Sequence, residues 1–383
     1  MTEPDFLRYE PWPLSQTLLK SLERSALITR TVISNLSKGQ ETVALSSNLN
    51  PPHWEFGHLI WFHELWVHRN GLHSNPSILP KADALFNSSG IIHDDRWQVQ
   101  LPSIDILQHY FLEVMERTFT ILRSGYLTSE QAYFIQLSLY HQDMHNEAFA
   151  YMWQSLAYAW PLDFDLGCLT AQPLDLKPCY IDFDECVFNS GSTPYAGFIF
   201  DNEKWQHEVL VPEFSISSHA VSNEEYLIFL EAQITSGASP IEHQPAYWKK
   251  EGDIWFERFF DQWQEIDLNA PVRHISARNA EQYCLWKGLR LPTENELSVL
   301  MSTAKEQWQP SSLWEWTSSA FMPFAGFSAD PYQDYSAPWF DGQHRVLKGW
   351  SAFTPNYLRR NQFRNFYLPH RKDFFCGFRT CLA

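Results

Sequence analysis

Hydrophobic residues recur every three or four positions through the first 160 residues, which is the spacing of helices with one buried face. The pattern predicts four long helices, at about 13–37, 52–69, 103–123 and 128–159. Pro51 and Pro52 favour a helix start, and Thr128 with Gln131 forms a capping-box pattern at the start of the fourth helix. The polar segment 71–102 is typical of the long crossover of a four-helix bundle.

The helical period ends at Trp160 and Pro161, and the following residues are rich in Pro and Gly. From about residue 200, short alternating strands with frequent Gly and Trp, and one clear helix at 277–287, indicate an irregular α+β region. A chain of 383 residues is too long for one ordinary core. We therefore expect a helical bundle over 1–160, a linker over 161–199 and a second domain over 200–383.

His141 and His145 lie four residues apart in the fourth predicted helix, so their side chains are one turn apart. Helical spacing puts both on the apolar face that is expected to be buried, and buried imidazoles need partners. A metal ion can be that partner. His58, on the inward stripe of the second helix, is the favoured third ligand, although periodicity leaves other histidines open. These are His53, His63 and His68.

Three imidazole ligands suit Zn, Cu, Fe or Ni, and they leave coordination positions open for reactants. An open site indicates chemistry rather than a structural role. Glu147 and Glu64 are candidate acceptors for an imidazole N–H, although Glu64 is equally compatible with a solvated surface carboxylate.

Charge and composition narrow the class of protein. A formal net charge of -17 argues against nucleic acid and anionic membranes as partners, because both attract basic surfaces. There is no apolar run of membrane-spanning length and no basic, apolar leader, which predicts a soluble cytoplasmic protein. The six scattered cysteines predict reduced thiols. Aromatic residues make up 16%, which is compatible with aromatic-lined pockets for a cationic ligand.

Several runs of residues resemble a known family. Residues 54–64, WEFGHLIWFHE, with the later His141, His145 and Glu147, resemble the DinB-like iron-binding bundle of the ergothioneine-type sulfoxide synthases (EgtB family). Blocks of the second half resemble the formylglycine-generating-enzyme domain, a variant of the C-type lectin fold. They read DNE at 201–203, VSNEEY at 221–226, GLRLPTE at 288–294, LWEWT at 313–317, RVLKG at 345–349 and GFR at 377–379. The resemblance spans nearly the whole chain and implies a two-domain α+β enzyme.

This resemblance implies Fe(II) held by His58, His141 and His145, with dioxygen as co-substrate. It also implies hercynine (Nα-trimethylhistidine) as substrate, with bond formation between imidazole C2 and the chalcogen of a thiol or selenol donor. In the family, a tyrosine in a Tyr-x-x-Tyr motif donates a proton or hydrogen atom to the reacting oxygen. The matching residues are Tyr332, the expected catalytic residue, and Tyr335, its neighbour at the substrate site.

Departures from the family concern the donor. Members that use γ-glutamylcysteine carry an Arg-x-x-Arg pair where this chain has His93 and Arg96, and an Asn-Trp-Asp run where it has 365–367, NFY. A missing guanidinium and a missing acid weaken recognition of a zwitterionic dipeptide. Both segments look most like the selenoneine synthase branch (SenA), which implies a selenosugar donor. Met144 replaces a Gln that hydrogen-bonds the substrate imidazole in some relatives.

Hercynine carries a trimethylammonium group, which binds best against the faces of aromatic rings. Phe366 is the position-matched candidate for that wall, with Asn365 beside it for the polar end of the substrate. The tryptophans Trp314, Trp316 and Trp339 are expected to pack in the core or in loops.

Other interpretations use the same residues. The donor could be γ-glutamylcysteine or cysteine, as in ergothioneine synthesis. The bundle alone is compatible with a zinc-dependent thiol transferase of the DinB type, which would not need oxygen. A formylglycine-generating oxidase is disfavoured because its two copper-binding cysteines fall on apolar positions within 358–363. A lectin-like binding protein without catalysis is disfavoured because all three histidines are present.

Overall fold

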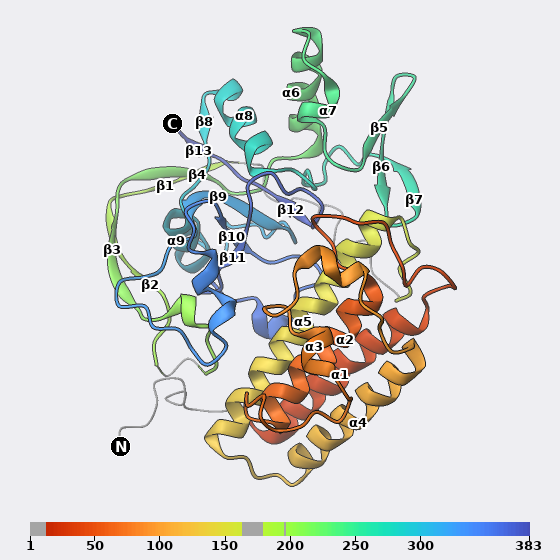
Figure 1. Ribbon diagram of the computed structural model, residues 1–383. Coiled ribbons are helices and arrows are strands. Elements are labelled where there is room, and N and C mark those ends of the chain that lie inside the picture. Colours follow the sequence, from red (N-terminus) through yellow and green to blue (C-terminus); the bar gives the residue numbers. More distant parts are fainter. Residues whose placement is uncertain (1–12, 163–178, 195–196) are drawn as a thin grey trace.

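The computed structural model describes residues 13–162, 179–194 and 197–383. A helical bundle is followed by a region of small sheets and short helices, and the two lie against each other (Figure 1). The sequence predicted this α+β order of a helical part and a strand-rich part.

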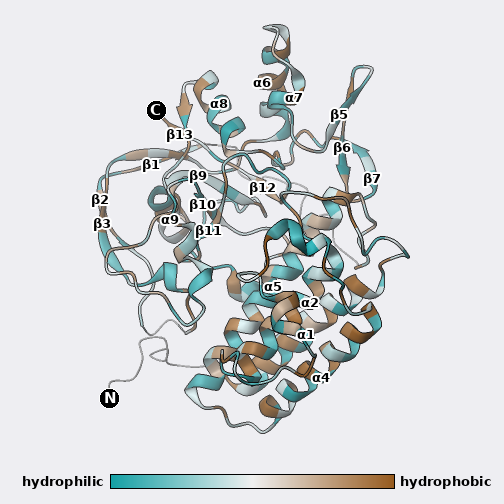
Figure 2. Cartoon of the chain, viewed as in Figure 1, coloured by the Kyte–Doolittle hydropathy of each residue, from teal (hydrophilic) through white to brown (hydrophobic). Residues whose placement is uncertain are grey.

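Four long helices, close to the predicted ones, make up the described part of the bundle. α2 ends in a π-helical turn, η2 (Glu64–His68), and the crossover carries the short α3 (Ala82–Phe86) and the 3-10 turn η3 (His93–Trp97). Figure 2 shows hydrophobic and hydrophilic residues alternating along these helices, as expected for elements with one buried face. The long helices are α1 (Ser15–Ser34), α2 (Pro52–His63), α4 (Ile104–Arg123) and α5 (Ser129–Leu156).

The predicted capping box opens α5. The Thr128 hydroxyl accepts from the Gln131 backbone N–H at 3.1 Å, and the Gln131 side chain accepts from the Thr128 backbone N–H at 3.0 Å. These two bonds satisfy donors that a helix start otherwise leaves unpaired. The helix that carries His141 and His145 therefore begins at a fixed residue.

The second region contains four small sheets among the described residues, with orders β1-β4-β13-β8, β11-β10-β9-β12, β2-β3 and β5-β6-β7. β12 pairs with β9 in parallel, and the other pairs are antiparallel. The strands are β1 (Tyr180–Phe183), β2 (Cys186–Ser190), β3 (His207–Val211), β4 (Phe214–Ser217), β5 (Trp248–Glu251), β6 (Ile254–Phe259), β7 (Gln262–Glu265), β8 (Leu289–Arg290), β9 (Trp314–Ala320), β10 (Arg345–Gly349), β11 (Asn365–Tyr367), β12 (Cys376–Gly377) and β13 (Cys381–Leu382).

Short helices connect these strands. The predicted helix at 277–287 is present as α8, and two helices that we did not predict, α6 and α9, begin with capping boxes at Ser222 and Thr293. The helices and turns are η5 (Asp201–Glu203), α6 (Asn223–Thr235), α7 (Pro240–His243), α8 (Ala277–Lys287), α9 (Glu294–Thr303), η6 (Gln333–Tyr335), η7 (Ala337–Trp339) and η8 (Asn356–Leu358).

The predicted linker over 161–199 needs a correction. β1 pairs with β4 and β2 pairs with β3, so residues 180–190 already belong to the sheets of the second region. The strands were missed because Pro and Gly flank them and each is only four or five residues long. Residues 163–178 lie outside the described residues.

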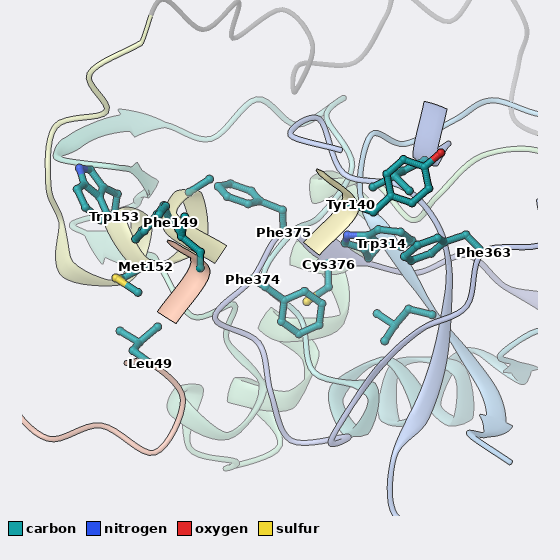
Figure 3. Packing of buried hydrophobic residues seen from close by; sticks show 14 of the residues in the cluster. Leu49, Tyr140, Phe149, Met152, Trp153, Trp314, Phe363, Phe374, Phe375 and Cys376 are labelled. Atoms are coloured by element: carbon teal, nitrogen blue, oxygen red, sulfur yellow. The ribbon is translucent and has the colours of Figure 1, made fainter. Parts of the chain in front are cut away.

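One hydrophobic cluster runs through the bundle and into the second region. Phe149 and Trp153 of α5 and Phe375 from near the end of the chain belong to this cluster and are labelled in Figure 3. Tyr140 of α5 also contacts Phe198 at 5.1 Å and Tyr357 at 5.5 Å between ring centroids. Because α5 is covered by the bundle on one side and by the second region on the other, side chains from both can meet at its surface.

The structure also bears on what the composition predicted about membrane spans, cysteines and tryptophans. No helix among the described residues combines the length and the apolar character needed to cross a membrane. Five cysteines of the described part, Cys179, Cys186, Cys284, Cys376 and Cys381, are free thiols. Trp314 and Trp316 are buried in the core, and Trp339, at the end of the turn η7, is 42% exposed.

Candidate metal centre

His58, His141 and His145 come together between α2 and α5. Each offers one ring nitrogen, and these three atoms lie within 4.8 Å of one another. His58 and His141 are buried, and His145 is partly exposed. Within the described residues this is the one group of three or more His, Cys, Asp or Glu side chains that meets such a limit. The helix spacing and the choice of His58 among the candidates therefore agree with the fold.

Hydrogen bonds orient two of the imidazoles. His58 Nδ1 lies 2.8 Å from the Phe86 carbonyl oxygen, which can only accept, so Nδ1 carries the proton and Nε2 keeps its lone pair. His145 Nδ1 lies 2.5 Å from Oε1 of Glu55, which leaves its Nε2 free in the same way. The Nε2 atoms of His141 and His145 are 3.1 Å apart. The Nε2 atoms of the two α5 imidazoles thus face each other.

Burial favours the neutral, metal-binding form of two of these imidazoles. It lowers the pKa of His58 to about 3, with the nearby His145 adding to the effect. Burial also lowers the pKa of His141 well below its ordinary value, again with a contribution from His145. Nδ1 of His141 is buried without a hydrogen-bond partner, and its ring stacks on Phe62 at 3.5 Å between centroids. Neutral imidazoles that face one another are the donor set that a divalent transition metal needs.

The carboxylate that orients His145 is Glu55, which the sequence prediction missed. Glu55 is buried and also accepts from Asn50 Nδ2 at 2.5 Å. Burial opposes its ionisation, but the charge and hydrogen bond of His145 hold the pKa of Glu55 at about 2. Its position three residues before His58, on the same helix face, was the available signal.

Glu147 and Glu64, the predicted acceptors, bind other groups. Glu147 accepts from Trp314 Nε1 at 2.6 Å, from Ser351 Oγ at 2.6 Å and from Thr354 Oγ1 at 2.8 Å. Glu64 is buried rather than solvated, and accepts from the Ile78 backbone N–H at 2.6 Å and from the Tyr110 hydroxyl. Neither carboxylate has a recorded hydrogen bond to the three histidines.

Arg96 is close enough to His58 to affect its charge, and its guanidinium contacts protein groups. Its guanidinium donates to Asn50 Oδ1 at 2.8 Å and to the Ser88 carbonyl oxygen at 3.2 Å, and it lies 4.2 Å above the Trp54 ring. Asn50 in turn donates to Glu55, so Arg96 connects with the carboxylate that orients His145. His93 does not share these hydrogen bonds. Its Nδ1 lies 3.0 Å from Asp94 Oδ1, and its Nε2 lies 3.2 Å from the Leu49 carbonyl oxygen.

Tyr332 reaches the centre from the second region. Its ring is edge-on to Phe62 at 4.8 Å and lies 6.1 Å from the His141 ring. Burial raises the pKa of the Tyr332 hydroxyl, with Asp334 and Asp201 adding to the shift, so the hydroxyl keeps its proton at neutral pH. The Tyr335 hydroxyl lies 3.8 Å from Met144 Sδ, and its ring stacks on Phe200.

A cavity lies between α5 and the second region, and none of the three histidines lines it. Asn365 lines it, as does Met144, while Phe366 stacks on Phe321 at 4.0 Å and is absent from the lining. The wall is aromatic and acidic, and burial raises the pKa of both its carboxyls, Asp143 to about 6. The lining residues are Asp143, Met144, Glu147, Tyr151, Trp314, Thr354, Leu358, Phe363, Asn365 and Tyr367.

Residues 182–309 match the family model of the sulfatase-modifying factor enzyme 1-like domain. This match defines the class of the second region and agrees with the fold predicted from its sequence blocks. It begins within β1, which supports a boundary before residue 200.

Comparison of the whole chain with known proteins gives relatives whose activity is named. The chain is 24% identical to the hercynine oxygenase of Mycobacterium tuberculosis over 86% of this chain and 90% of that one. It is 27% identical to the hercynine oxygenase of Mycolicibacterium smegmatis over the same shares. Ergothioneine biosynthesis protein 1 of Schizosaccharomyces pombe is 30% identical over 48% of this chain and 27% of that protein. The chain is thus similar to hercynine oxygenases over most of its length, and this similarity indicates an enzyme of the oxidoreductase class.

Proposed function

We propose that the chain is an iron-dependent oxygenase that joins a chalcogen to the imidazole C2 of hercynine, in the biosynthesis of ergothioneine-type compounds. The observation that carries this proposal is the meeting of His58, His141 and His145 beside Tyr332 at the interface of the two regions. The similarity to hercynine oxygenases over 86% of the chain supports the substrate.

The proposed cofactor is Fe(II), held by the three imidazoles. Three neutral nitrogen ligands fit a first-row divalent metal and leave positions open. When bound, iron would supply a redox centre for dioxygen and a template for the reactants. The protein supplies the other groups of the site: Phe86 and Glu55 orient two of the ligands, and the protonated Tyr332 hydroxyl is the proposed proton donor.

The overall reaction balances with dioxygen alone as the oxidant. With a thiol donor, hercynine C2–H, R–SH and O2 give a C2–S(=O)–R sulfoxide and one water. Dioxygen accepts four electrons, two from formation of the C–S bond and two from oxidation of sulfur. One oxygen atom enters the sulfoxide, and the other leaves as water with the two hydrogens.

The cavity beside Met144 is the proposed site for the trimethylammonium end of hercynine. Its aromatic rings, among them Tyr151 and Tyr367, suit a quaternary ammonium ion, and the Glu147 carboxylate supplies the opposite charge. Asn365 lines the same cavity and remains the proposed contact for the polar end. This assignment moves the expected aromatic wall from Phe366 to its neighbour Tyr367.

A selenosugar is the proposed donor within this family. Arg96 is stacked on Trp54, and its two terminal guanidinium nitrogens already donate to Asn50 and Ser88, while its Nε has no partner. His93 has neither the charge nor the reach of the second guanidinium in the dipeptide-using relatives, and Tyr367 replaces their acid. These departures favour a neutral, hydroxyl-bearing donor over γ-glutamylcysteine or cysteine.

Competition between donors tests this proposal. The Fe(II) protein is given hercynine and equal amounts of a selenosugar, the matching thiosugar, cysteine and γ-glutamylcysteine in air, and C2-substituted products are quantified by mass spectrometry. We expect the selenosugar product to dominate. A preference for γ-glutamylcysteine would instead assign an ergothioneine sulfoxide synthase, and activity with Zn(II) without oxygen would assign a thiol transferase.

A further inference from the structure

We infer that Asp330 and Asp334 are positioning residues that hold Tyr332 against the bundle, through hydrogen bonds to Tyr133 and Ser89. This inference rests on the proposed function, because it concerns how the proposed proton donor is held in place. The segment 330–336, which we call the tyrosine loop, belongs to the second region, whereas the three histidines belong to the bundle. Contacts across the interface must therefore set the distance between them.

The backbone of the tyrosine loop has little regular structure of its own. Tyr332 precedes the three-residue turn η6, and the Tyr335 backbone N–H donates to the Tyr332 carbonyl oxygen at 3.2 Å. A single turn of this kind does not fix a side chain to the precision that proton transfer needs. The position of Tyr332 consequently depends on side-chain bonds on both sides of it.

Asp330 makes the strongest of these bonds. Lys204 Nζ lies 2.5 Å and 2.6 Å from its two carboxylate oxygens, and the Tyr133 hydroxyl donates to Oδ2 at 3.1 Å. Only 6% of the Lys204 side chain and 12% of the Asp330 side chain are exposed, so the pair is shielded from water and held in one geometry. Tyr133 is on α5, eight residues before His141. Its bond therefore connects the loop to the helix that carries His141 and His145.

Asp334 makes the second cross-region bond. It accepts from the Ser89 hydroxyl in the crossover of the bundle. Ser89 follows Phe86 by three residues, and the Phe86 carbonyl is the group that orients His58. This bond is exposed and therefore weaker than the Asp330 anchor, but it links the loop to the segment that supports the third ligand.

A third anchor holds the loop to its own region, as the Lys204–Asp330 pair also does. Ser336, which is fully buried, donates to Asp201 Oδ1 at 2.5 Å and accepts from Asn202 Nδ2 at 3.0 Å. This anchor alone would fix the end of the loop to the second region without relating Tyr332 to the bundle. The hydrogen bonds of Asp330 and Asp334 to the bundle flank Tyr332, at two residues before and two residues after it. Together with the packing of the Tyr332 ring on Phe62, they set the position of Tyr332 relative to the histidines.

Variants that remove only hydroxyl groups test the inference on the full-length Fe(II) protein. These are Tyr133→Phe, Ser89→Ala and the double variant. Tyr226→Phe is the matched control, because its buried hydroxyl donates to the His243 carbonyl oxygen in the second region. Two quantities are measured: hydrogen–deuterium exchange of the peptide covering 330–336, and the product ratio, defined as C2-substituted hercynine divided by oxidised donor. Fe(II) affinity is measured alongside.

For the double variant we expect exchange of the tyrosine loop to rise about 10-fold, the usual effect of losing a hydrogen bond to a charged group. We expect the product ratio to fall in the same direction as in Tyr332→Phe, with Fe(II) affinity unchanged. Unchanged exchange and an unchanged ratio in the double variant, with a lowered ratio in Tyr332→Phe, would overturn the inference and leave the proposed function intact. An unchanged ratio in Tyr332→Phe itself would remove the proposed role of Tyr332 and the inference with it.

Discussion

Glu55 accepts a 2.5 Å hydrogen bond from Nδ1 of His145, and this bond joins α2 to an imidazole of the candidate metal centre on α5. Glu55→Gln keeps the shape of the side chain but removes the charge that favours this imidazole orientation. Loss of such a supporting carboxylate typically weakens metal binding by about 10- to 100-fold, and we expect a loss in that range. Anaerobic titration with Fe(II) or Co(II) measures it.

Glu64→Gln is the matched control for that measurement. Glu64 is also buried and close to the end of α2, but it accepts from Ser77, Ile78 and Tyr110. Its substitution should affect stability and leave metal affinity near that of the wild type. Equal losses of affinity in the two variants would mean that Glu55 acts through the fold rather than through His145.

Tyr332→Phe should leave Fe(II) and hercynine binding intact, since the ring still packs on Phe62. Because the variant lacks the buried hydroxyl, we expect it to lose at least about 10-fold in C2 substitution, the lower range for a positioned proton donor, and to oxidise donor instead. Mass spectrometry of both products checks this. A product ratio equal to that of the wild type would assign proton transfer to another group.

Glu147→Gln should weaken hercynine binding. The carboxylate lines the cavity beside Met144, and removing its charge takes away the partner of the trimethylammonium group. We expect KM for hercynine to rise about 10-fold or more, with Fe(II) affinity retained. Steady-state kinetics at saturating donor measure the change. A KM unaffected by the substitution would place the ammonium elsewhere.

Asp201 predicts a dependence of stability on pH. Burial raises its pKa from an ordinary 3.8 to about 6, with the Asp330 charge adding to the shift and the Ser336 hydrogen bond opposing it. The folded state then holds this proton more tightly than the unfolded state, so the contribution to stability is present below pH 3.8 and is lost as pH rises to 6. The loss is about 3 kcal/mol for this shift, to within a factor of two.

Asp201→Asn removes this titration. We expect the free energy of unfolding of the variant, relative to the wild type, to increase by a few kcal/mol between pH 4 and pH 7. Urea unfolding at several pH values gives this difference directly. Parallel pH profiles for the two proteins would show that the folded pKa of Asp201 is ordinary.

The sequence predicted features that depend on local periodicity. The capping box of Thr128 and Gln131, the long bundle helices and the shared face of His141 and His145 all follow from spacing within one segment, and the structure contains them. The strands β1 and β2 in the predicted linker and the helices α6 and α9 were missed, because stretches of 4 to 13 residues carry too few repeats of either period.

Partners that come from distant segments could not be predicted in this way. Glu147 was expected near an imidazole, but packing of the second region gives it Trp314, Ser351 and Thr354. Glu55 meets His145 because α2 packs against α5. The spacing of Glu55 from His58 places it on the same helix face, but the 90 residues between Glu55 and His145 leave no local signal for their pairing. The placement of Tyr332 beside His141 followed from family resemblance and not from any spacing in the chain.

The most direct test of the central claim is the fate of the hercynine C2 hydrogen. Protein loaded with Fe(II) under anaerobic conditions is mixed with hercynine and the selenosugar, dioxygen is admitted, and the C2 position is followed by NMR and mass spectrometry. We expect loss of the C2 hydrogen and a C2-chalcogen product that require both iron and dioxygen, and no product from His141→Ala. An intact C2 hydrogen with every donor, or equal turnover with Zn(II) in the absence of dioxygen, would contradict the account.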